Sequence, residues 1–284
     1  MSTETDATPK RSTSNVVALR SIAALAAIVL IVLAFFLGRA SVSGTSDSAS
    51  EPKGGSETAA ANGDDSQANR LIEEFAKKNN LTPEQDFGLM MNEHGKQTLG
   101  ALVKDSASPG RTLGKASAPI TLTIFEDFSC PMCTVWQKET FPGLMKYVDS
   151  GAVKFQWHNM VIFGKEYRSD LAAQGSIAAM NQGKMWDFIS AAYQEAGDGD
   201  HTVYDEATVM NIAKAAGIRN LEKFRSDMLS TQTIDIVKKE TAAAHKAGIG
   251  GTPFFVLGDT VVSGAYPLEY FENTIKFQQF LLNS

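Results

Sequence analysis

The residues in this chain best suited to chemistry are two cysteines separated by a proline and a methionine, Cys130-Pro131-Met132-Cys133. They are the only two cysteines among 284 residues, so no other cysteine is left to form a static disulfide. A thiolate is the reactive form of cysteine, and a C-x-x-C motif that opens a helix lowers the pKa of its thiol. The pair therefore favours reversible dithiol–disulfide chemistry.

A helix is predicted to begin at this motif and to activate its first cysteine. Pro131 falls at the first helical position, where the missing N–H of proline is not needed. The unpaired N–H groups of the first turn and the positive end of the helix dipole can stabilise a thiolate on Cys130. The spacing brings Cys133 to the same end of the helix, one turn deeper. We therefore expect Cys130 to be exposed and to react first, and Cys133 to be buried and to resolve the mixed disulfide.

Two static uses of a cysteine pair are less well supported. A structural zinc site needs four ligands, and the chain offers only two cysteines and four histidines that lack metal-binding spacing (His94, His158, His201 and His245). A structural disulfide across one helix turn would close too small a loop to add much stability. We therefore expect neither a metal ion nor a cofactor.

A second candidate element is the dipeptide Thr252-Pro253. A proline at the start of a strand is common, so the dipeptide alone is weak evidence for a site. Together with the C-x-x-C motif and the strand-like run that follows, it fits a cis-proline loop packed against the active site. Such a loop leaves the Thr252 backbone able to hydrogen-bond an extended substrate beside Cys130. We expect substrate contacts there and at Pro131 and Met132.

The elements that must position these residues follow from the hydrophobic periodicity. A strand is predicted over residues 120–128, a helix from 132 to about 148, and a second strand over 153–157. A strand–helix–strand unit of this length implies parallel strands joined by a right-handed crossover. The C-x-x-C motif would then lie where the first strand meets the helix.

The rest of the chain is predicted to be helical before it returns to strands. Three or four helices are expected between residues 166 and 229, and another over 234–246. A hairpin follows, with strands at 252–257 and 260–263, and a helix over 267–282 closes the chain. The order βαβ, helical block, ββα predicts an α/β, thioredoxin-like fold over residues 111–284, with a helical domain inserted at about 165–233.

The N-terminal region is predicted to place this domain outside the cytoplasm. Residues 21–38 are uncharged and mostly aliphatic, and they are about long enough to cross a bilayer as a helix. Basic residues precede this run, so residues 1–20 should stay in the cytoplasm. A cleaved signal peptide would have a shorter apolar core and a small-x-small cleavage site. An uncleaved, single-pass membrane anchor is therefore favoured.

Two segments are expected between this anchor and the catalytic domain. Residues 39–69 are mainly small and acidic, which predicts a flexible linker. Residues 70–110 carry some helix-like spacing and should form a helical lead-in.

The hydrophobic fraction of 43% predicts a packed core, and the net charge of −6 argues against nucleic acid as a partner.

These motifs resemble DsbA-like thiol:disulfide oxidoreductases, especially the membrane-anchored forms of Gram-positive and actinobacterial envelopes. The similarity runs from residue 111 to the C-terminus and is carried by residues 113–119, 125–133, 251–256 and 262–265. It implies that Cys130 is the nucleophile, Cys133 the resolving thiol and Pro253 a cis-proline. It also implies unfolded exported proteins as substrates, and a membrane quinone-linked oxidase, of the DsbB or vitamin-K-epoxide-reductase-like type, that regenerates the disulfide.

The chain departs from the family pattern at two positions. Many relatives have an acidic residue six positions before the first cysteine, thought to relay protons, where this chain has Ile124. Glu126 lies on the same face of the strand as position 124 and is the candidate to replace this acidic residue. A surface or hydrogen-bonded glutamate without that role is the simpler interpretation. Asp127 matches a common aspartate of the family, for which a turn or helix-entry role is expected. Met132 stands where the strongest oxidant has histidine, which favours a less oxidising disulfide.

Three functions remain open at this point. The leading one is a monomeric, extracytoplasmic enzyme that donates the Cys130–Cys133 disulfide to exported proteins. A reductase or isomerase on the same scaffold would differ in redox potential and partner, but isomerases usually dimerise through an added domain, and the N-terminal helices are too short for one. A non-catalytic envelope binding protein with vestigial cysteines is disfavoured by the intact C-P-x-C and T-P motifs.

Overall fold

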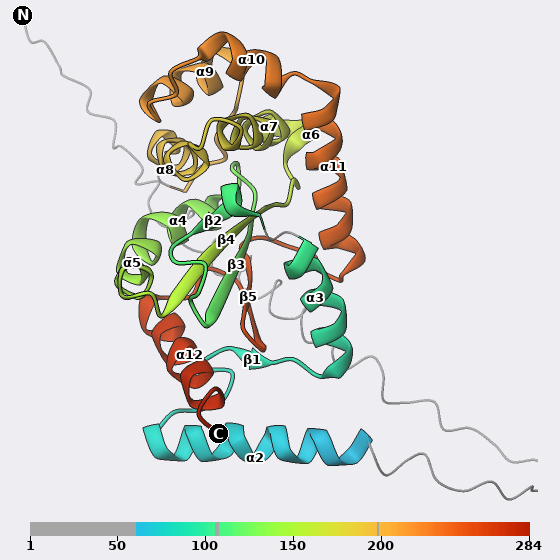
Figure 1. Ribbon diagram of the computed structural model, residues 1–284, viewed down its shortest axis with the longest axis vertical. Helices are drawn as coiled ribbons and strands as arrows, with labels where there is room; N and C mark the ends of the chain where they lie inside the picture. Colours follow the sequence, from blue (N-terminus) through green and yellow to red (C-terminus); the bar gives the residue numbers. More distant parts are fainter. Residues whose placement is uncertain (1–60, 106–107, 198) are drawn as a thin grey trace, which may run out of the picture. The chain divides into compact units, whose positions relative to one another are not determined.

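The computed structural model describes residues 61–105, 108–197 and 199–284, and a single mixed sheet runs through this part of the chain (Figure 1). Its six strands lie in the order β1-β6-β5-β3-β4-β2. Their bounds are Leu89–Met90 (β1), Thr112–Leu113 (β2), Ile120–Glu126 (β3), Val153–Asn159 (β4), Phe254–Leu257 (β5) and Thr260–Ser263 (β6).

The described helices lie on both sides of this sheet and in a block between β4 and β5 (Figure 1). Their bounds are Ala61–Asn79 (α2), Glu93–Asp105 (α3), Pro131–Glu139 (α4), Phe141–Ser150 (α5), Gly164–Tyr167 (α6), Ser169–Met180 (α7), Met185–Glu195 (α8), Glu206–Ala215 (α9), Leu221–Met228 (α10), Thr231–Lys246 (α11) and Leu268–Leu281 (α12), with a 3₁₀ turn at Pro109–Arg111.

The pairing of β3 confirms the predicted βαβ unit. Strand β3 runs parallel to β4 from Ile120 opposite Val153 to Glu126 opposite Asn159. On its other side β3 pairs antiparallel with β5, and β5 forms the expected hairpin with β6. β3 pairs with β4 over all seven of its residues and with β5 from Leu122 to Phe125, so the strand that leads to the cysteines lies in the interior of the sheet.

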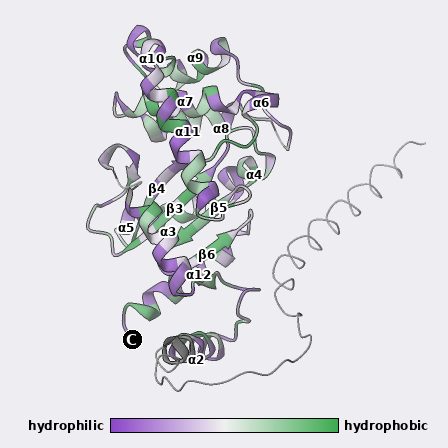
Figure 2. Ribbon diagram, turned by 90° about the vertical axis from the view of Figure 1, so that its right-hand side faces the viewer, coloured by the Kyte–Doolittle hydropathy of each residue, from purple (hydrophilic) through white to green (hydrophobic). Residues whose placement is uncertain are grey.

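Alternation along β3 divides the core into two layers, because successive side chains of a strand face opposite sides of the sheet. Leu122 and Ile124 belong to the cluster that includes Cys133 and Trp136 of α4. Phe125, the residue after Ile124, faces the other side and belongs to a second cluster with residues of α3 and α11. In Figure 2 the central strands are coloured mainly as hydrophobic, as expected for a sheet covered on both faces.

The single helix predicted over residues 132–148 is wrong: the segment forms two helices, α4 and α5, separated at Thr140. Pro142 explains the break, since it has no N–H to donate and its ring would clash with the carbonyl of Lys138 in a continuous helix. The Thr140 hydroxyl instead donates to the Tyr266 carbonyl at 3.0 Å. The break ends α4 after about two turns and ties this end to the loop before α12.

In the described residues, the block between β4 and α11 contains four helices between residues 166 and 229, α7 to α10, which confirms the predicted number; the four-residue helix α6 begins just before them, at Gly164. Its core is close-packed: a Cβ on Gly175 of α7 would lie 2.6 Å from a ring carbon of Phe188 on α8. A larger residue at position 175 would therefore separate the two helices.

The lead-in is more extensive than predicted and belongs to the fold. Helix α2 begins at Ala61, so the linker predicted over residues 39–69 is wrong for residues 61–69. It packs on α12, where the centre of the Phe75 ring lies 5.0 Å from that of Phe277. The Phe75 ring also lies 5.2 Å from that of Phe87, in the segment before β1. The two-residue edge strands β1 and β2 were not predicted.

The predicted cytoplasmic segment 1–20, the anchor at 21–38 and the linker as far as residue 60 lie outside the described residues. Within the described ranges, no helix has the length and apolar character needed to cross a bilayer.

Candidate active site

Cys130 lies at the junction between β3 and α4, as predicted. It is the N-cap residue of α4 with extended backbone angles (φ −79°, ψ 119°), and Pro131 is the first helical residue. The Cys130 N–H donates to the Asp127 carbonyl at 3.0 Å, and its own carbonyl accepts from the Thr134 N–H at 3.1 Å. The first turn of α4 therefore directs its free N–H groups toward the Cys130 sulfur.

The two thiols have opposite acidities. A hydrogen bond from the Cys133 thiol lowers the pKa of Cys130 from 9.0 to about 6, against the effect of burial; the N–H groups of Cys133 and Met132 contribute further. Burial raises the pKa of Cys133 well above 9.0, and the same hydrogen bond and the charge of Glu126 add to this. In the reduced site the first cysteine thus carries the negative charge and the second keeps its proton.

The first cysteine is less accessible than predicted. Cys133 is fully buried, as expected, but Cys130 is only 5% exposed, so the expectation of an exposed first cysteine is wrong. The loop at Thr252 covers it: the Cys130 sulfur lies 3.3 Å from the Thr252 carbonyl oxygen. The residue that reaches solvent is Met132, whose side chain is 49% exposed, while Pro131 is half-buried.

The peptide bond between Thr252 and Pro253 is cis, as predicted. Pro253 is buried, and its carbonyl accepts from the Gly264 N–H at 2.9 Å, which fixes the loop to the end of β6. The Thr252 hydroxyl oxygen is buried without a hydrogen-bond partner among the described residues. Residues 252 and 253 are thus held against Cys130, 122 positions away in sequence.

Glu126 lies inside the protein, beneath the dithiol. It is 1% exposed, so the expectation of a surface glutamate is wrong, while that of a hydrogen-bonded one is confirmed. Its Oε2 accepts from the Gln137 side chain at 2.8 Å, and its Oε1 has no partner in the described structure. Burial raises the pKa of Glu126 well above 4.5, although the hydrogen bond from Gln137 and the nearby Tyr193 hydroxyl oppose this. The surroundings therefore favour the protonated form of this carboxyl group.

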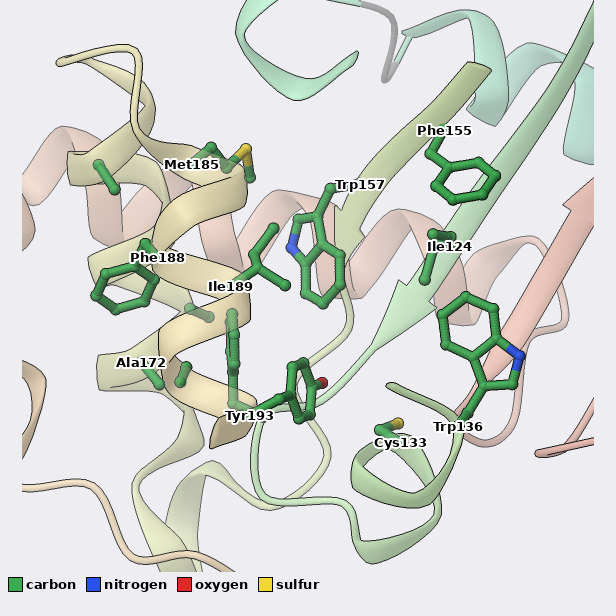
Figure 3. Packing of buried hydrophobic residues seen from close by; sticks show 14 of the residues in the cluster. Ile124, Cys133, Trp136, Phe155, Trp157, Ala172, Met185, Phe188, Ile189 and Tyr193 are labelled. Atoms are coloured by element: carbon green, nitrogen blue, oxygen red, sulfur yellow. The ribbon is translucent and has the colours of Figure 1, made fainter. Parts of the chain in front are cut away.

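Sequence reasoning missed two residues near Glu126, Gln137 and Tyr193. Gln137 lies one turn beyond Cys133 on the same face of α4, a spacing that would have placed it near the site. Tyr193 comes from α8 in the helical insertion, and Figure 3 shows it beside Cys133, with Trp136 on the other side in this view. The insertion thus closes over the buried thiol.

Asp127 has the turn role that was predicted for it, and it also joins the active site to the insertion. Its Oδ1 accepts from the Ser129 N–H at 2.7 Å. Its Oδ2 accepts from the N–H groups of Ile162 and Phe163, at 2.6 and 2.8 Å, and from the Ser169 hydroxyl at 2.9 Å. Burial raises the pKa of Asp127, and these four hydrogen bonds oppose the increase.

In the described part of the chain, no group of three or more histidine, cysteine, aspartate or glutamate side chains is arranged to hold a metal ion.

Comparison with known proteins agrees with this geometry. A family model described as thioredoxin matches residues 106–277. The protein named "Probable disulfide bond formation protein D" in Bacillus anthracis is 30% identical over 148 residues, which cover 51% of this chain and 68% of that protein. The chain belongs to the thioredoxin family as a DsbA-like thiol:disulfide oxidoreductase.

Other DsbA-like proteins show how far the similarity extends. Disulfide bond formation protein D of Bacillus subtilis is 26% identical over 165 residues, 58% of this chain and 74% of that protein. The crystal structure of oxidised BdbD from the same organism matches with a TM-score of 0.55 at 25% identity, over 62% of this chain and 96% of that one. Wolbachia pipientis α-DsbA1 has the same fold at 21% identity, with a TM-score of 0.54.

Proposed function

We propose that this DsbA-like oxidoreductase donates its Cys130–Cys133 disulfide to unfolded exported proteins on the extracytoplasmic side of the membrane. The observation that carries this proposal is the opposite acidity of the two thiols, with the pKa of Cys130 lowered to about 6 and that of Cys133 raised. A thiolate stabilised in the reduced form makes the reduced form more favourable, and hence the disulfide more oxidising. This is the property that a disulfide donor needs.

The proposed reaction has two thiol–disulfide exchanges. A substrate thiolate attacks the Cys130 sulfur, the Cys130–Cys133 bond breaks, and Cys133 leaves as a thiolate that takes up a proton. A second substrate thiolate then attacks the substrate sulfur of the mixed disulfide, and Cys130 leaves as a thiolate. The substrate loses two electrons to form its disulfide, and the enzyme is left reduced. The low pKa of Cys130 makes it a good leaving group in the second exchange.

The proton for Cys133 has a source in Glu126. The carboxyl group is buried, its pKa is raised, and its charge raises the pKa of Cys133. We therefore assign Glu126 the role of proton donor when Cys133 leaves, and of acceptor when the disulfide is restored. Gln137 holds the carboxyl in place through the 2.8 Å hydrogen bond.

Substrate contacts are assigned to the four residues that surround Cys130. The cis-proline loop brings the Thr252 carbonyl to the Cys130 sulfur, where an extended substrate segment could hydrogen-bond in its place. Pro253 supports this loop from beneath. Pro131 and the half-exposed Met132 form the rim on the helix side.

The proposed location and partners of the enzyme rest on its sequence and on its relatives. The uncharged run at residues 21–38 supports a single-pass anchor that keeps the catalytic domain at the outer face of the membrane, where substrates emerge. The relatives named disulfide bond formation protein D support the oxidative direction. A reduced enzyme needs reoxidation, for which we propose a membrane quinone-linked oxidase of the DsbB or vitamin-K-epoxide-reductase-like type. The enzyme would act as a monomer.

The equilibrium reduction potential of the full-length protein in glutathione buffers tests the proposal. A reduction potential of about −120 mV supports a disulfide donor, whereas one of about −270 mV, as in thioredoxin, would favour a reductase. On mixing with a reduced unfolded protein, the disulfide form should generate substrate disulfides. Cys130→Ser and Cys133→Ser should both abolish this. When Cys133→Ser is instead mixed with a disulfide-bonded protein, its Cys130 thiolate should attack that disulfide and remain as a mixed disulfide, because no resolving thiol releases it. Activity that persists in Cys130→Ser would refute the assignment of the nucleophile.

A further inference from the structure

Met132 differs from the other methionines of the described chain in its accessibility. Its side chain is 49% exposed, and it is the one methionine among the large hydrophobic residues that reach solvent in the described structure. The other described methionines are buried (Met91, Met160, Met185 and Met228) or half-buried (Met90, Met145, Met180 and Met210). A reagent that attacks thioether sulfur from solvent therefore meets Met132 first.

The position of Met132 links its side chain to the reaction. It is the second residue of α4, between the two cysteines, and its N–H helps to lower the pKa of Cys130. The exposed Ile162 is also held at this turn, because its N–H donates to Asp127. An unfolded substrate that reaches Cys130 thus meets apolar surface at the rim of the site.

The modification itself is simple two-electron chemistry. A peroxide or hypochlorous acid transfers one oxygen atom to the thioether sulfur, which is oxidised to a sulfoxide, while the oxidant is reduced to water or chloride. In the disulfide form of the enzyme the two cysteine sulfurs are bonded to each other and present no thiolate to the oxidant. Met132 is then the accessible oxidisable sulfur of the site.

We propose that Met132 is a reversible oxidation site, and that its conversion to the sulfoxide slows the reaction of the enzyme with polypeptide thiols. The slower reaction with polypeptide thiols rests on the proposed function, in which Met132 contacts the substrate. A sulfoxide is polar and is poorly accommodated against apolar substrate residues, so the encounter with a polypeptide weakens. A small hydrophilic thiol such as glutathione makes little use of this surface and should be affected much less.

The experiment treats the full-length protein, in its disulfide form, with hydrogen peroxide and follows each methionine by peptide mass spectrometry. We expect Met132 to be oxidised at least about tenfold faster than the buried methionines. The rate at which the treated enzyme oxidises a reduced unfolded protein should fall about fivefold, which corresponds to the loss of one partly buried methionine contact. Its rate with reduced glutathione should change less than about twofold, and a methionine sulfoxide reductase should restore the original rate.

Two variants serve as controls, each compared with itself before and after peroxide. Met132→Leu has no thioether at this position, so its rate with polypeptides should be insensitive to peroxide. Met210→Leu, on α9, should remain as sensitive as the wild type. Faster oxidation of another described methionine would overturn the modification site, and an unchanged polypeptide rate in fully oxidised enzyme would overturn its effect. An untreated enzyme that fails to oxidise polypeptides would instead refute the proposed function, while the peptide map would still decide the modification site.

Discussion

The Nδ1 atom of His201 lies 2.7 Å from the carbonyl oxygen of Ser129, the residue immediately before the nucleophilic cysteine. A carbonyl oxygen only accepts hydrogen bonds, so this nitrogen carries the proton. The Ser129 hydroxyl donates in return to the Thr202 carbonyl at 2.7 Å, and the His201 ring stacks on Tyr167 at 4.4 Å. The segment between α8 and α9 thus fixes the backbone that presents Cys130 to the first turn of α4.

Replacing His201 by alanine should therefore change the acidity of Cys130, although His201 is a positioning residue. With Ser129 released, the N–H groups of α4 are expected to point less accurately at the Cys130 sulfur, and the pKa of that thiol should rise. Loss of one hydrogen bond should also lower the free energy of unfolding by about 1 kcal/mol. Thiolate absorbance at 240 nm against pH, in the reduced protein, measures the first effect.

His201→Asn is the matched variant, because its amide can donate to the Ser129 carbonyl but cannot stack on Tyr167. It should recover most of the low pKa of Cys130 and less of the stability. If His201→Ala lost stability while its thiolate titration stayed the same, the contact would be structural only.

A second prediction concerns the hydrogen bonds that Asp127 accepts from both sides of the site. Asp127→Asn keeps the size of the side chain but replaces one acceptor oxygen by an NH₂ group, which faces N–H donors. The N–H groups of Ile162 and Phe163 then lose their acceptor, and each buried unsatisfied group costs about 1–3 kcal/mol. We expect chemical denaturation to show a loss of about 3 kcal/mol or more, together with slower oxidation of substrates.

Ser169→Ala provides the comparison, because it removes one donor to the same oxygen and leaves the two backbone donors satisfied. It should lose about 1 kcal/mol. Equal losses in the two variants would mean that the Ile162 and Phe163 contacts contribute little.

The sequence was sufficient where the signal is local. Alternating hydrophobic residues predicted β3, and a proline after Cys130 predicted the start of α4, because both depend on neighbouring residues. The two-residue strands β1 and β2 are too short to show a period. The polar composition of the first residues of α2 predicts a linker, whereas the helix is stabilised by the distant contact of Phe75 with Phe277.

The candidate site shows the same division. The cysteine pair and Thr252-Pro253 carry spacing signals, and the structure brings them together. The burial of Cys130, the Gln137–Glu126 hydrogen bond and the contact of His201 with Ser129 depend on tertiary packing, the last across 72 residues. A histidine in a loop has no periodicity or spacing that could have indicated this contact.

A third prediction follows from the acidity of Cys130 in the reduced protein. Its thiolate should titrate with a midpoint near pH 6. The folded pKa lies below the unfolded value of 9.0, so the folded reduced protein releases a proton that the unfolded chain keeps between these values. The stability gained from the thiolate is therefore present at high pH and is lost as the pH falls through about 6. Absorbance at 240 nm and urea unfolding at several pH values measure the two effects.

Substitutions at Cys133 separate the causes of this shift. Cys133→Ala removes the largest cause, the hydrogen bond from the Cys133 thiol, and should raise the midpoint. Cys133→Ser keeps a donor and should raise it less. A midpoint near 9 in the wild-type protein would contradict the assignment of Cys130 as a stabilised thiolate.

The last prediction concerns Glu126 and the pH dependence of stability. Because its pKa is raised above 4.5 in the folded state, the folded protein keeps a proton that the unfolded chain releases as the pH rises above about 4.5. This contribution to stability is therefore complete below pH 4.5 and declines at higher pH, by up to about 1.4 kcal/mol per pH unit, until the folded pKa is reached. Glu126→Gln has no such proton and should lack the decline.

Urea unfolding of the disulfide form between pH 4 and pH 8 measures this difference without interference from thiol titration. The variant should gain stability relative to the wild type as the pH rises, while the acceptor for Gln137 is retained by the new amide oxygen. Glu139→Gln, on the same helix as Gln137 but exposed, should follow the wild-type pH dependence. Parallel curves for Glu126→Gln and the wild type would mean that Glu126 is ionised in the folded protein, and the role of proton donor to Cys133 would then have to be abandoned.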